Sequence, residues 1–455
     1  MAGWQRRRPG AGRGVTVPSP IHQLLADLDL EATGEAMHSF IARAFPICRS
    51  ITGEGVRRTL ALVREKVPLE VHEVPSGTPV LDWTVPLEWN VREAWVKGPD
   101  GRKVVDFADS NLHLVSYSSP VHERMPLSLL KEHLHSLPDQ PDLIPYRTSY
   151  YSEAWGFCLP HRLAEALPEG DYEVLVDSTL EPGSLSYGEL LLPGESEREV
   201  LLSCHACHPS LANDNLSGVA VTVWLAELLA TVPRRYSYRF LWTPGTIGSI
   251  TWLARNEERV GRIAHGLVAA NLGDPGPFTY KRSRRGDAEI DRAAAHVLAT
   301  SGGEHAVQDF VPFGYDERQF CSPGFDLPVG CLSRTPWGRY PQYHTSADDL
   351  DFVRPLALAE SLATCLRVLA VLEGNRRYRN LNPRGEPQLG RRGLYRALGG
   401  ESHRDRELAL LWVLNLCDGR ASLLDVARRS GLPFPAVEEA AEALLAAALL
   451  EEVRE

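Results

Sequence analysis

Long apolar runs and an excess of positive charge are both missing from this 455-residue chain. No stretch approaches the ~20 consecutive apolar residues that a membrane helix needs, so we expect no membrane partner. The net charge of −11 argues against nucleic acid or an anionic membrane surface as the main partner. The arginine-rich start has no apolar segment after its paired arginines and so does not resemble a secretory signal. We therefore expect a soluble, cytoplasmic protein.

Cysteine is also sparse, with eight residues dispersed along the chain. This distribution is typical of reduced thiols rather than of a disulfide framework. The closest pair, Cys204 and Cys207, could form half of a structural zinc ribbon, but no second pair follows at a suitable spacing. A redox pair would normally open a helix, whereas Pro209 and a polar loop follow here. Both interpretations are therefore disfavoured.

The pattern of apolar and polar residues changes several times along the sequence, and these changes divide the chain into parts. Alternating strands and helices predict an α/β fold with a three-layer α/β/α core and a mostly parallel sheet. Short alternating runs separated by Gly and Pro turns predict a β-rich domain inserted into that core. The expected parts are a disordered tail (1–20), the α/β core (21–75 and 190–378), the inserted domain (76–189), a polar linker (379–402) and a winged-helix-like domain (403–455).

Acidic residues mark the third expected helix of the C-terminal domain. It carries Glu438, Glu439 and Glu442 and contains no lysine or arginine. Insertion of this helix into DNA is therefore unfavourable. We expect this domain to contact a protein partner or a second copy of the chain, which would give a homo-oligomer.

The segment 203–218 is the most informative about function, because it contains candidate metal-binding residues. His205 follows the apolar run 200–202, which predicts a buried strand, and Asp214 precedes the apolar helix expected over 219–226. Far downstream, His344 lies in a Tyr-His-Thr segment. A histidine at a strand end and an aspartate in the next loop place metal donors at the carboxyl edge of a sheet. Neutral imidazole and carboxylate suit zinc.

These segments resemble the zinc aminopeptidase superfamily, which also includes glutamate carboxypeptidases and glutaminyl cyclases. The resemblance implies one or two zinc ions bound by His205, Asp214, Asp274 and His344, with Asp214 bridging two ions where both are present. The spacing to Asp214 favours His205 as a ligand, and His208 remains the alternative.

Several further segments are similar to a bacterial family of aminopeptidase-like proteins. They are residues 48–53, 82–86, 150–157 and 280–287. Members of that family have an inserted N-terminal domain and a C-terminal winged helix. Many accompany genes for polysaccharide or natural-product biosynthesis.

One expected feature is missing. Superfamily peptidases carry a Glu-Glu pair after the middle strand, and Trp242-Thr243 stands at that place. Glu317 is the candidate replacement for the catalytic base, and Arg318 and Tyr343 are candidates for substrate binding. An ion pair between Asp316 and Arg318 that orders their loop is an equally good interpretation.

The sequence thus predicts a zinc-dependent hydrolase that acts on a small peptide or amide. Two alternatives stay open because of the missing Glu-Glu pair. One is a single-zinc cyclase or amide-processing biosynthetic enzyme, and the other is a catalytically inactive binding protein.

Overall fold

The computed structural model describes residues 20–394 and 401–453, without the side chains of residues 401–404. The tail expected over 1–20 lies almost wholly outside the described residues, as do residues 395–400 of the expected linker. The chain separates into two compact units, one of residues 24–369 and one of residues 370–455 with the N-terminal residues up to 23.

Helices begin the described part of the chain. They are α1 (Pro20–Asp27), α2 (Leu30–Ala44) and α3 (Glu54–Arg64). The Asp29 side chain caps α2 by accepting a hydrogen bond from the backbone of Ala32, and α2 buries Met37, Phe40 and Ile41 on one face. Phe40 packs edge-on against Trp224 of the core. The apolar spacing of this region therefore becomes a helical layer on the α/β core.

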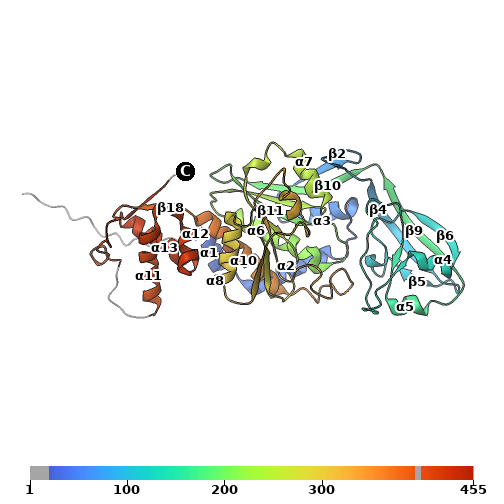
Figure 1. The fold of residues 1–455 in the computed structure, drawn as a ribbon. Helices are drawn as coiled ribbons and strands as arrows, with labels where there is room; N and C mark the ends of the chain where they lie inside the picture. Colours follow the sequence, from blue (N-terminus) through green and yellow to red (C-terminus); the bar gives the residue numbers. More distant parts are fainter. Residues whose placement is uncertain (1–19, 395–400, 454–455) are drawn as a thin grey trace, which may run out of the picture. The chain divides into compact units, whose positions relative to one another are not determined.

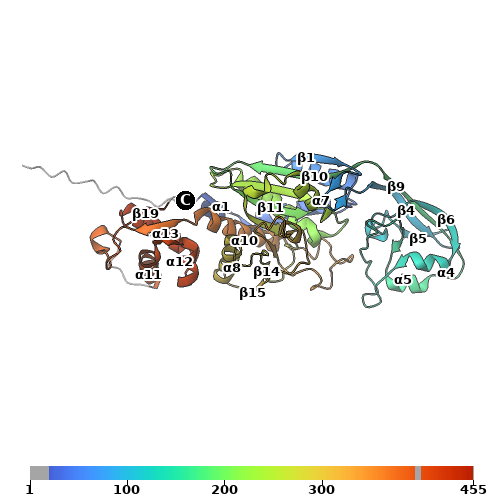
Figure 2. The same ribbon diagram turned by 45° about the horizontal axis from the view of Figure 1, so that its top comes forward.

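An eight-stranded sheet forms the centre of the core (Figures 1 and 2). Its order is β1-β10-β12-β11-β13-β16-β14-β15, and the neighbours β12, β11, β13 and β16 run parallel. The antiparallel pairs are β1–β10, β10–β12 and β14–β16, so the sheet is mixed with a parallel centre. The strands are β1 (Glu70–Pro75), β10 (Ser184–Leu192), β11 (Glu199–His205), β12 (Ser237–Thr243), β13 (Ile263–Ala269), β14 (Phe278–Lys281), β15 (His305–Gln308) and β16 (Val329–Ser333).

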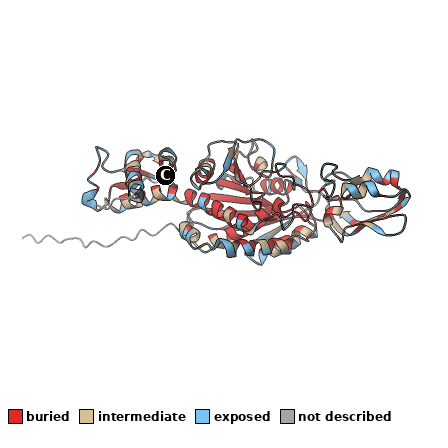
Figure 3. Ribbon diagram, turned by 90° about the horizontal axis from the view of Figure 1, so that it is seen from below, coloured by how far each residue is buried: buried red, intermediate tan, exposed pale blue. Residues whose placement is uncertain are grey.

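The middle strands are buried on both faces, as Figure 3 shows. Every residue of β11 and β12 is buried, and the buried charges of Arg239 and Glu199 form an ion pair. The helices of the core are α6 (Gly218–Leu229), α7 (Ile247–Arg255), α8 (Glu289–Thr300), α9 (Glu317–Phe320) and α10 (Pro355–Gly374). Among the described residues only α10 is long and apolar enough to cross a membrane, and 78% of its most apolar window is buried inside the protein, as in a core helix.

The inserted region is built on a four-stranded antiparallel sheet with the order β5-β4-β9-β6. It also holds two small two-stranded sheets, β2–β3 and β7–β8. Its elements are β2 (Pro79–Val80), β3 (Trp83–Thr84), β4 (Glu88–Lys97), β5 (Lys103–Asp106), β6 (Val121–Pro126), α4 (Leu127–Leu130), β7 (Leu134–His135), β8 (Phe157–Cys158), α5 (His161–Ala166) and β9 (Asp171–Glu181).

The described residues from 377 onward form three α-helices and a three-stranded sheet with the order β18-β17-β19. They are β17 (Arg377–Asn380), α11 (Glu401–Leu416), β18 (Asp418–Ser422), α12 (Leu423–Ser430), α13 (Phe434–Ala446) and β19 (Leu450–Glu452). Helix α12 begins with a capping box between Ser422 and Asp425, and it ends at Gly431, whose φ of 73° suits glycine. Strand β17 includes the first two residues of the polar segment that the sequence marks as a linker.

Candidate metal centre

The carboxyl end of β11 places the first donors. His205 is the last residue of this strand and lies opposite Thr243 of β12 in the parallel register. His208 follows in the loop, and Asp214 lies in the irregular helical turn 212–217 that leads into α6. Because β11 is a central parallel strand, its end opens onto the sheet edge where loops from several strands meet. Local sequence therefore determines where His205 and Asp214 lie.

Three histidines surround the buried carboxylate of Asp214. Its Oδ1 lies 2.8 Å from Nε2 of His205, and its Oδ2 lies 3.0 Å from Nε2 of His344. Nδ1 of His208 is 3.4 Å from the same Oδ2. The rings of His208 and His344 have centroids 5.3 Å apart. The structure thus joins three sequence-predicted donors, and His208 as well, in one cluster.

Electrostatics keep Asp214 ionised. Burial alone would raise the pKa of this carboxyl, but the nearby histidines hold it well below its usual range, with His208 and His205 contributing most. Burial also acts to lower the pKa of His208, yet the Asp214 charge outweighs it and raises that pKa. For His205 burial prevails and lowers the pKa. A full negative charge is therefore present where a cation would bind.

The hydrogen-bond partners of the two neighbouring histidines assign different tautomers to them. His208 donates from Nδ1 to the backbone carbonyl of Asp214 at 3.1 Å, which leaves the lone pair of its Nε2 available. The side-chain amide of Asn215 donates to Nδ1 of His205 at 3.4 Å, so the hydrogen of His205 lies on Nε2, facing Asp214. A backbone carbonyl that fixes Nδ1–H is the usual support of a metal-binding histidine.

Two further acids support the Asp214 loop. Asp348 accepts hydrogen bonds from the backbone N–H groups of Asn213 (2.6 Å) and Asp214 (3.0 Å). Burial, reinforced by the Asp214 charge, raises the pKa of Asp348 to about 8. Asp274 accepts from the Thr335 hydroxyl at 2.6 Å and from the Asn213 side chain at 3.1 Å.

Asp274 therefore contacts the Asp214 loop through Asn213. Both of its carboxylate oxygens accept hydrogen bonds from other residues of the chain. Among the described residues, His205, His208 and Asp214 form a compact donor group that could hold an ion, with ligand atoms within 4.8 Å of one another. Asp348 is the aspartate that ends the Tyr-His-Thr-x-x-Asp segment resembling the superfamily, although an acid at this place also fits a helix N-cap.

Two buried residues of the core, Trp242 and Thr243, occupy the position of the missing Glu-Glu pair. The Trp242 indole is fully buried, donates to the hydroxyl of Thr222 at 2.9 Å and stacks on Phe240. Thr243 is buried, and its hydroxyl has no hydrogen-bond partner among the described residues. Neither side chain can accept a proton or bind a cation well, so this strand end supplies no base.

Asp316 is a buried carboxylate near the same strand end. A Cβ added to Gly245 would lie 3.0 Å from Cβ of His205 and 3.4 Å from Oδ1 of Asp316, so only the bare glycine separates the two side chains. Oδ1 of Asp316 accepts a hydrogen bond from Ser249 at 3.0 Å, while Oδ2 has no partner among the described residues. Burial, reinforced by the charge of Glu317, raises the pKa of Asp316 to about 7.

Glu317 and Arg318 face other partners. Glu317 is fully buried and forms an ion pair with Lys281, and within the described ranges no hydrogen bond or ion pair joins it to the histidines. The guanidinium of Arg318 lies 5.7 Å from the centre of the Phe313 ring. Lys281 therefore neutralises the charge of the sequence-predicted base, Glu317.

Aromatic rings enclose the cluster. Tyr343 stacks on His344 with ring centroids 3.9 Å apart, and Tyr315 stacks on His205 at 4.9 Å. Tyr146, which comes from the inserted region, meets His344 and His208 edge-on at 5.0 and 5.2 Å. Tyr343, the sequence-predicted substrate contact, thus lies directly beside a cluster histidine. Tyr146 has no motif around it that could have marked it.

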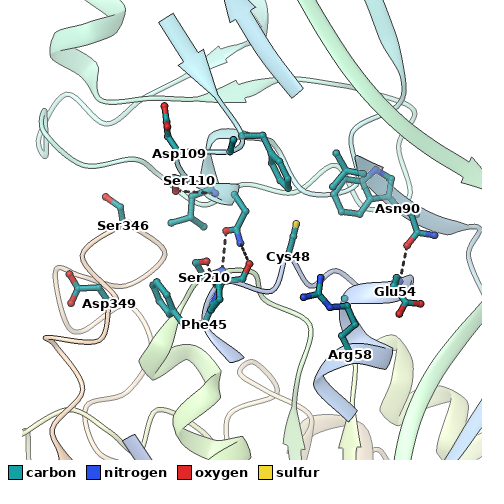
Figure 4. A pocket seen from close by; sticks show the side chains of 18 of the residues that line it. Phe45, Cys48, Glu54, Arg58, Asn90, Asp109, Ser110, Ser210, Ser346 and Asp349 are labelled. Atoms are coloured by element: carbon teal, nitrogen blue, oxygen red, sulfur yellow. Dashed lines mark hydrogen bonds between the residues drawn. The ribbon is translucent and has the colours of Figure 1, made fainter. Parts of the chain in front are cut away.

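A cavity of about 570 Å³ borders the loops that carry two of the histidines (Figure 4). Ser210 and Ser346, each two residues beyond a cluster histidine, form part of its wall. Asn90 and Ser110 of the inserted region line another part, and the thiol of Cys48 points into the space. The inserted region therefore shapes the surroundings of the cluster.

Two known protein families match the chain, one over the α/β core with its inserted region and one over the C-terminal domain. A family model described as a domain of unknown function, DUF4910, matches residues 38–375. The chain belongs to the DUF4910 family. A winged helix-turn-helix model matches residues 376–452. This confirms the winged-helix module expected from the sequence.

A DUF4910 relative from Clostridium acetobutylicum is 52% identical over 419 residues, covering 92% of this chain and 96% of the relative. Its name assigns it to polysaccharide biosynthesis and gives it an aminopeptidase-like domain. A crystal structure from the same organism, described as that of a peptidase, has a TM-score of 0.90 at 50% identity and covers 95% of this chain and 99% of its own.

More distant structures share the fold. A zinc aminopeptidase from Bacillus subtilis has a TM-score of 0.54 at 13% identity, covering 74% of this chain and 94% of its own. An M28 peptidase precursor from Shewanella amazonensis has the same score and identity, covering 78% and 96%. The expected fold class, an aminopeptidase-like α/β core with a C-terminal winged helix, is confirmed.

Proposed function

We propose that this protein is a zinc-dependent hydrolase that cleaves the amide bond of a small peptide or amide. The observation that carries the proposal is the buried, ionised carboxylate of Asp214 within hydrogen-bond range of three imidazoles. Such a donor set fits zinc, since zinc sites in proteins combine histidine nitrogen and carboxylate oxygen. The aminopeptidase-like fold and the name of the 52% identical relative support the same class of chemistry.

The protein would bind one zinc ion through Asp214, His208 and His344. Hydrogen bonding favours His208 over His205, the reverse of the preference drawn from sequence spacing, because the hydrogen of His208 is fixed on Nδ1 whereas Asn215 fixes that of His205 on Nε2. His344 also directs Nε2 at Asp214, but no donor within the described residues holds its Nδ1, so its hydrogen can move there when zinc binds Nε2. Asp274 would act from outside the donor set by holding Asn213. With Trp242 and Thr243 in place of two glutamates, a second ion would lack a ligand.

A bound zinc would polarise the substrate carbonyl and lower the pKa of a coordinated water. Residues of the chain would accept the proton of the attacking water. Asp316 would accept the proton of the attacking water at its free Oδ2, while Ser249 holds Oδ1. The raised pKa of Asp316, about 7, suits a group that gains and loses a proton near neutral pH. Glu317, held by Lys281, is the weaker candidate for this role.

The aromatic rings would exclude water and orient the substrate. Tyr343 and Tyr315 cover the faces of two histidines, so a substrate would approach along their free edges. Arg318 remains the proposed partner of a substrate carboxylate or carbonyl. The C-terminal domain would bind a protein partner or a second copy of the chain in the cytoplasm.

The experiment is hydrolysis of a panel of aminoacyl 4-nitroanilides and dipeptides by the zinc-loaded full chain. Wild type should cleave at least one member, and Asp214→Asn should lose about 100-fold or more because the central donor is neutralised. Cleavage that survives unchanged in the variant would place the chemistry elsewhere.

A second candidate is a binding protein without catalysis. The burial of Trp242 where the superfamily has a glutamate favours it. Tight binding of a peptide by zinc-loaded protein, with no cleavage across the panel, would favour this candidate over the hydrolase.

A further inference from the structure

We propose that the inserted domain positions the cluster histidine His344, so that residues 144–146 set the affinity of the metal centre. The proposal rests on the metal-binding part of the proposed function and not on hydrolysis. It gives the inserted domain a role in the site itself.

The backbone of His344 needs support from outside its own loop. Its φ is +54°, in the left-handed region that residues other than glycine rarely adopt. Tyr343 and His344 lie outside any regular helix or strand. A loop left to itself would populate other conformations, and Nε2 of His344 would then leave Asp214.

The inserted domain supplies that support through main-chain hydrogen bonds. The N–H of Tyr146 donates to the carbonyl of His344 at 2.8 Å, and the N–H of Ser346 donates to the carbonyl of Ile144 at 2.8 Å. Between them Pro145 and Thr345 form an antiparallel bridge. The N–H of Ile144 also donates to the hydroxyl of Ser346 at 3.0 Å. Bonds to the carbonyl of His344 and to Ser346, two residues further on, thus hold its unusual conformation.

The side chain of Tyr146 restrains the imidazole rings. It is buried, with 6% of its surface exposed, and its ring meets His344 and His208 edge-on. Its hydroxyl lies 3.0 Å from that of Tyr150, which fixes the orientation of the ring. Tyr146 is therefore a positioning residue for two of the histidines, in the way that partners beyond the direct ligands orient metal-binding imidazoles.

The loop of His208 is held from the same side. The side-chain carbonyl of Asn111 accepts a hydrogen bond from the N–H of Ser210 at 3.2 Å. Asn111 belongs to the inserted domain, and Ser210 lies two residues beyond His208. One structural unit thus contacts both loops that carry the proposed histidine ligands.

The test measures zinc affinity of the full chain by competition with a chromophoric chelator. Tyr146→Ala should weaken zinc binding tenfold or more, which is the range for loss of a group that orients ligands. Tyr146→Phe keeps the ring and the backbone bond and loses only the hydroxyl contact with Tyr150, so it should weaken zinc binding less than Tyr146→Ala does. Ser346→Ala should have an intermediate effect, since it removes one of the bonds beside His344.

Ser178→Ala is the matched control. Its hydroxyl donates to the carbonyl of Ser118 at 2.8 Å, so the bond that the substitution removes lies inside the inserted domain. It should lower the melting temperature without changing zinc affinity. Wild-type affinity in Tyr146→Ala would overturn the proposal, and so would equal weakening in Ser178→Ala, which would indicate general destabilisation.

Peptide hydrolysis measured on the same samples separates the two proposals. Zinc binding that depends on Tyr146, without hydrolysis by wild type, supports the positioning role and contradicts the hydrolase. A wild-type chain that binds no zinc contradicts both.

Discussion

Replacing Asp316 by asparagine removes a buried carboxyl group whose pKa burial raises from 3.8 to about 7. The variant keeps an oxygen that can accept the hydrogen bond from Ser249. Because the folded-state pKa is the higher one, the protonated carboxyl favours folding. This contribution is fully present below pH 4 and is lost as the pH rises through about 7. The asparagine side chain cannot ionise, so the variant should not show this loss.

The raised pKa sets the size of the effect. The difference between 3.8 and about 7 corresponds to about 4 kcal/mol between the two protonation states, as an order of magnitude. We therefore expect the unfolding free energy of Asp316→Asn, relative to wild type, to rise by several kcal/mol between pH 4 and pH 8.

Urea unfolding of metal-free protein at several pH values measures this difference. Asp109→Asn removes one negative charge from an exposed position and is the matched control. Parallel stability profiles for wild type and Asp316→Asn would refute the reasoning, since they would mean that Asp316 ionises as easily in the folded as in the unfolded protein.

In zinc-loaded protein the hydrolysis rate should rise with pH through about 7. The variant should lose about 100-fold while it retains zinc.

Three further predictions concern the ligands, the sequence-predicted base and the packing. His208→Ala should weaken zinc binding, measured by chelator competition, at least tenfold more than His205→Ala, and equal effects would contradict the tautomer assignment. Lys281→Met leaves the Glu317 charge buried without its partner and should lower the urea-unfolding free energy by about 3 kcal/mol, whereas an unchanged value would mean that the pair is solvated. Gly218→Ala places a Cβ 2.4 Å from the Ala269 carbonyl oxygen and should cost about 1–3 kcal/mol, seen as a lower melting temperature; an unchanged one would show that the site relaxes freely.

Local patterns carried much of the fold and the first donors of the site. The apolar run 200–202 and the segment 238–242, apolar except for Arg239, lie within buried parallel strands, and a histidine at the carboxyl end of such a strand faces the sheet edge. His205 and Asp214 could be found because His205 ends one strand and Asp214 lies in the loop that follows it. His344 could be found because its segment resembles a known one.

Contacts between distant segments could not be read in the same way. Tyr146 meets a histidine about 200 positions away through a main-chain bridge, and no residue pattern marks such a bridge. The tautomer of His208 depends on how the Asp214 loop turns. Glu317 and Asp316 are neighbours in the sequence, and only the fold brings Lys281 to the one and Ser249 to the other.

The zinc content of the purified full chain tests the central claim most directly. Elemental analysis of wild type beside Asp214→Ala, after both are supplied with zinc and desalted, should give about one zinc per chain in wild type and almost none in the variant. Stoichiometric zinc in Asp214→Ala, or no zinc in wild type, would contradict the account.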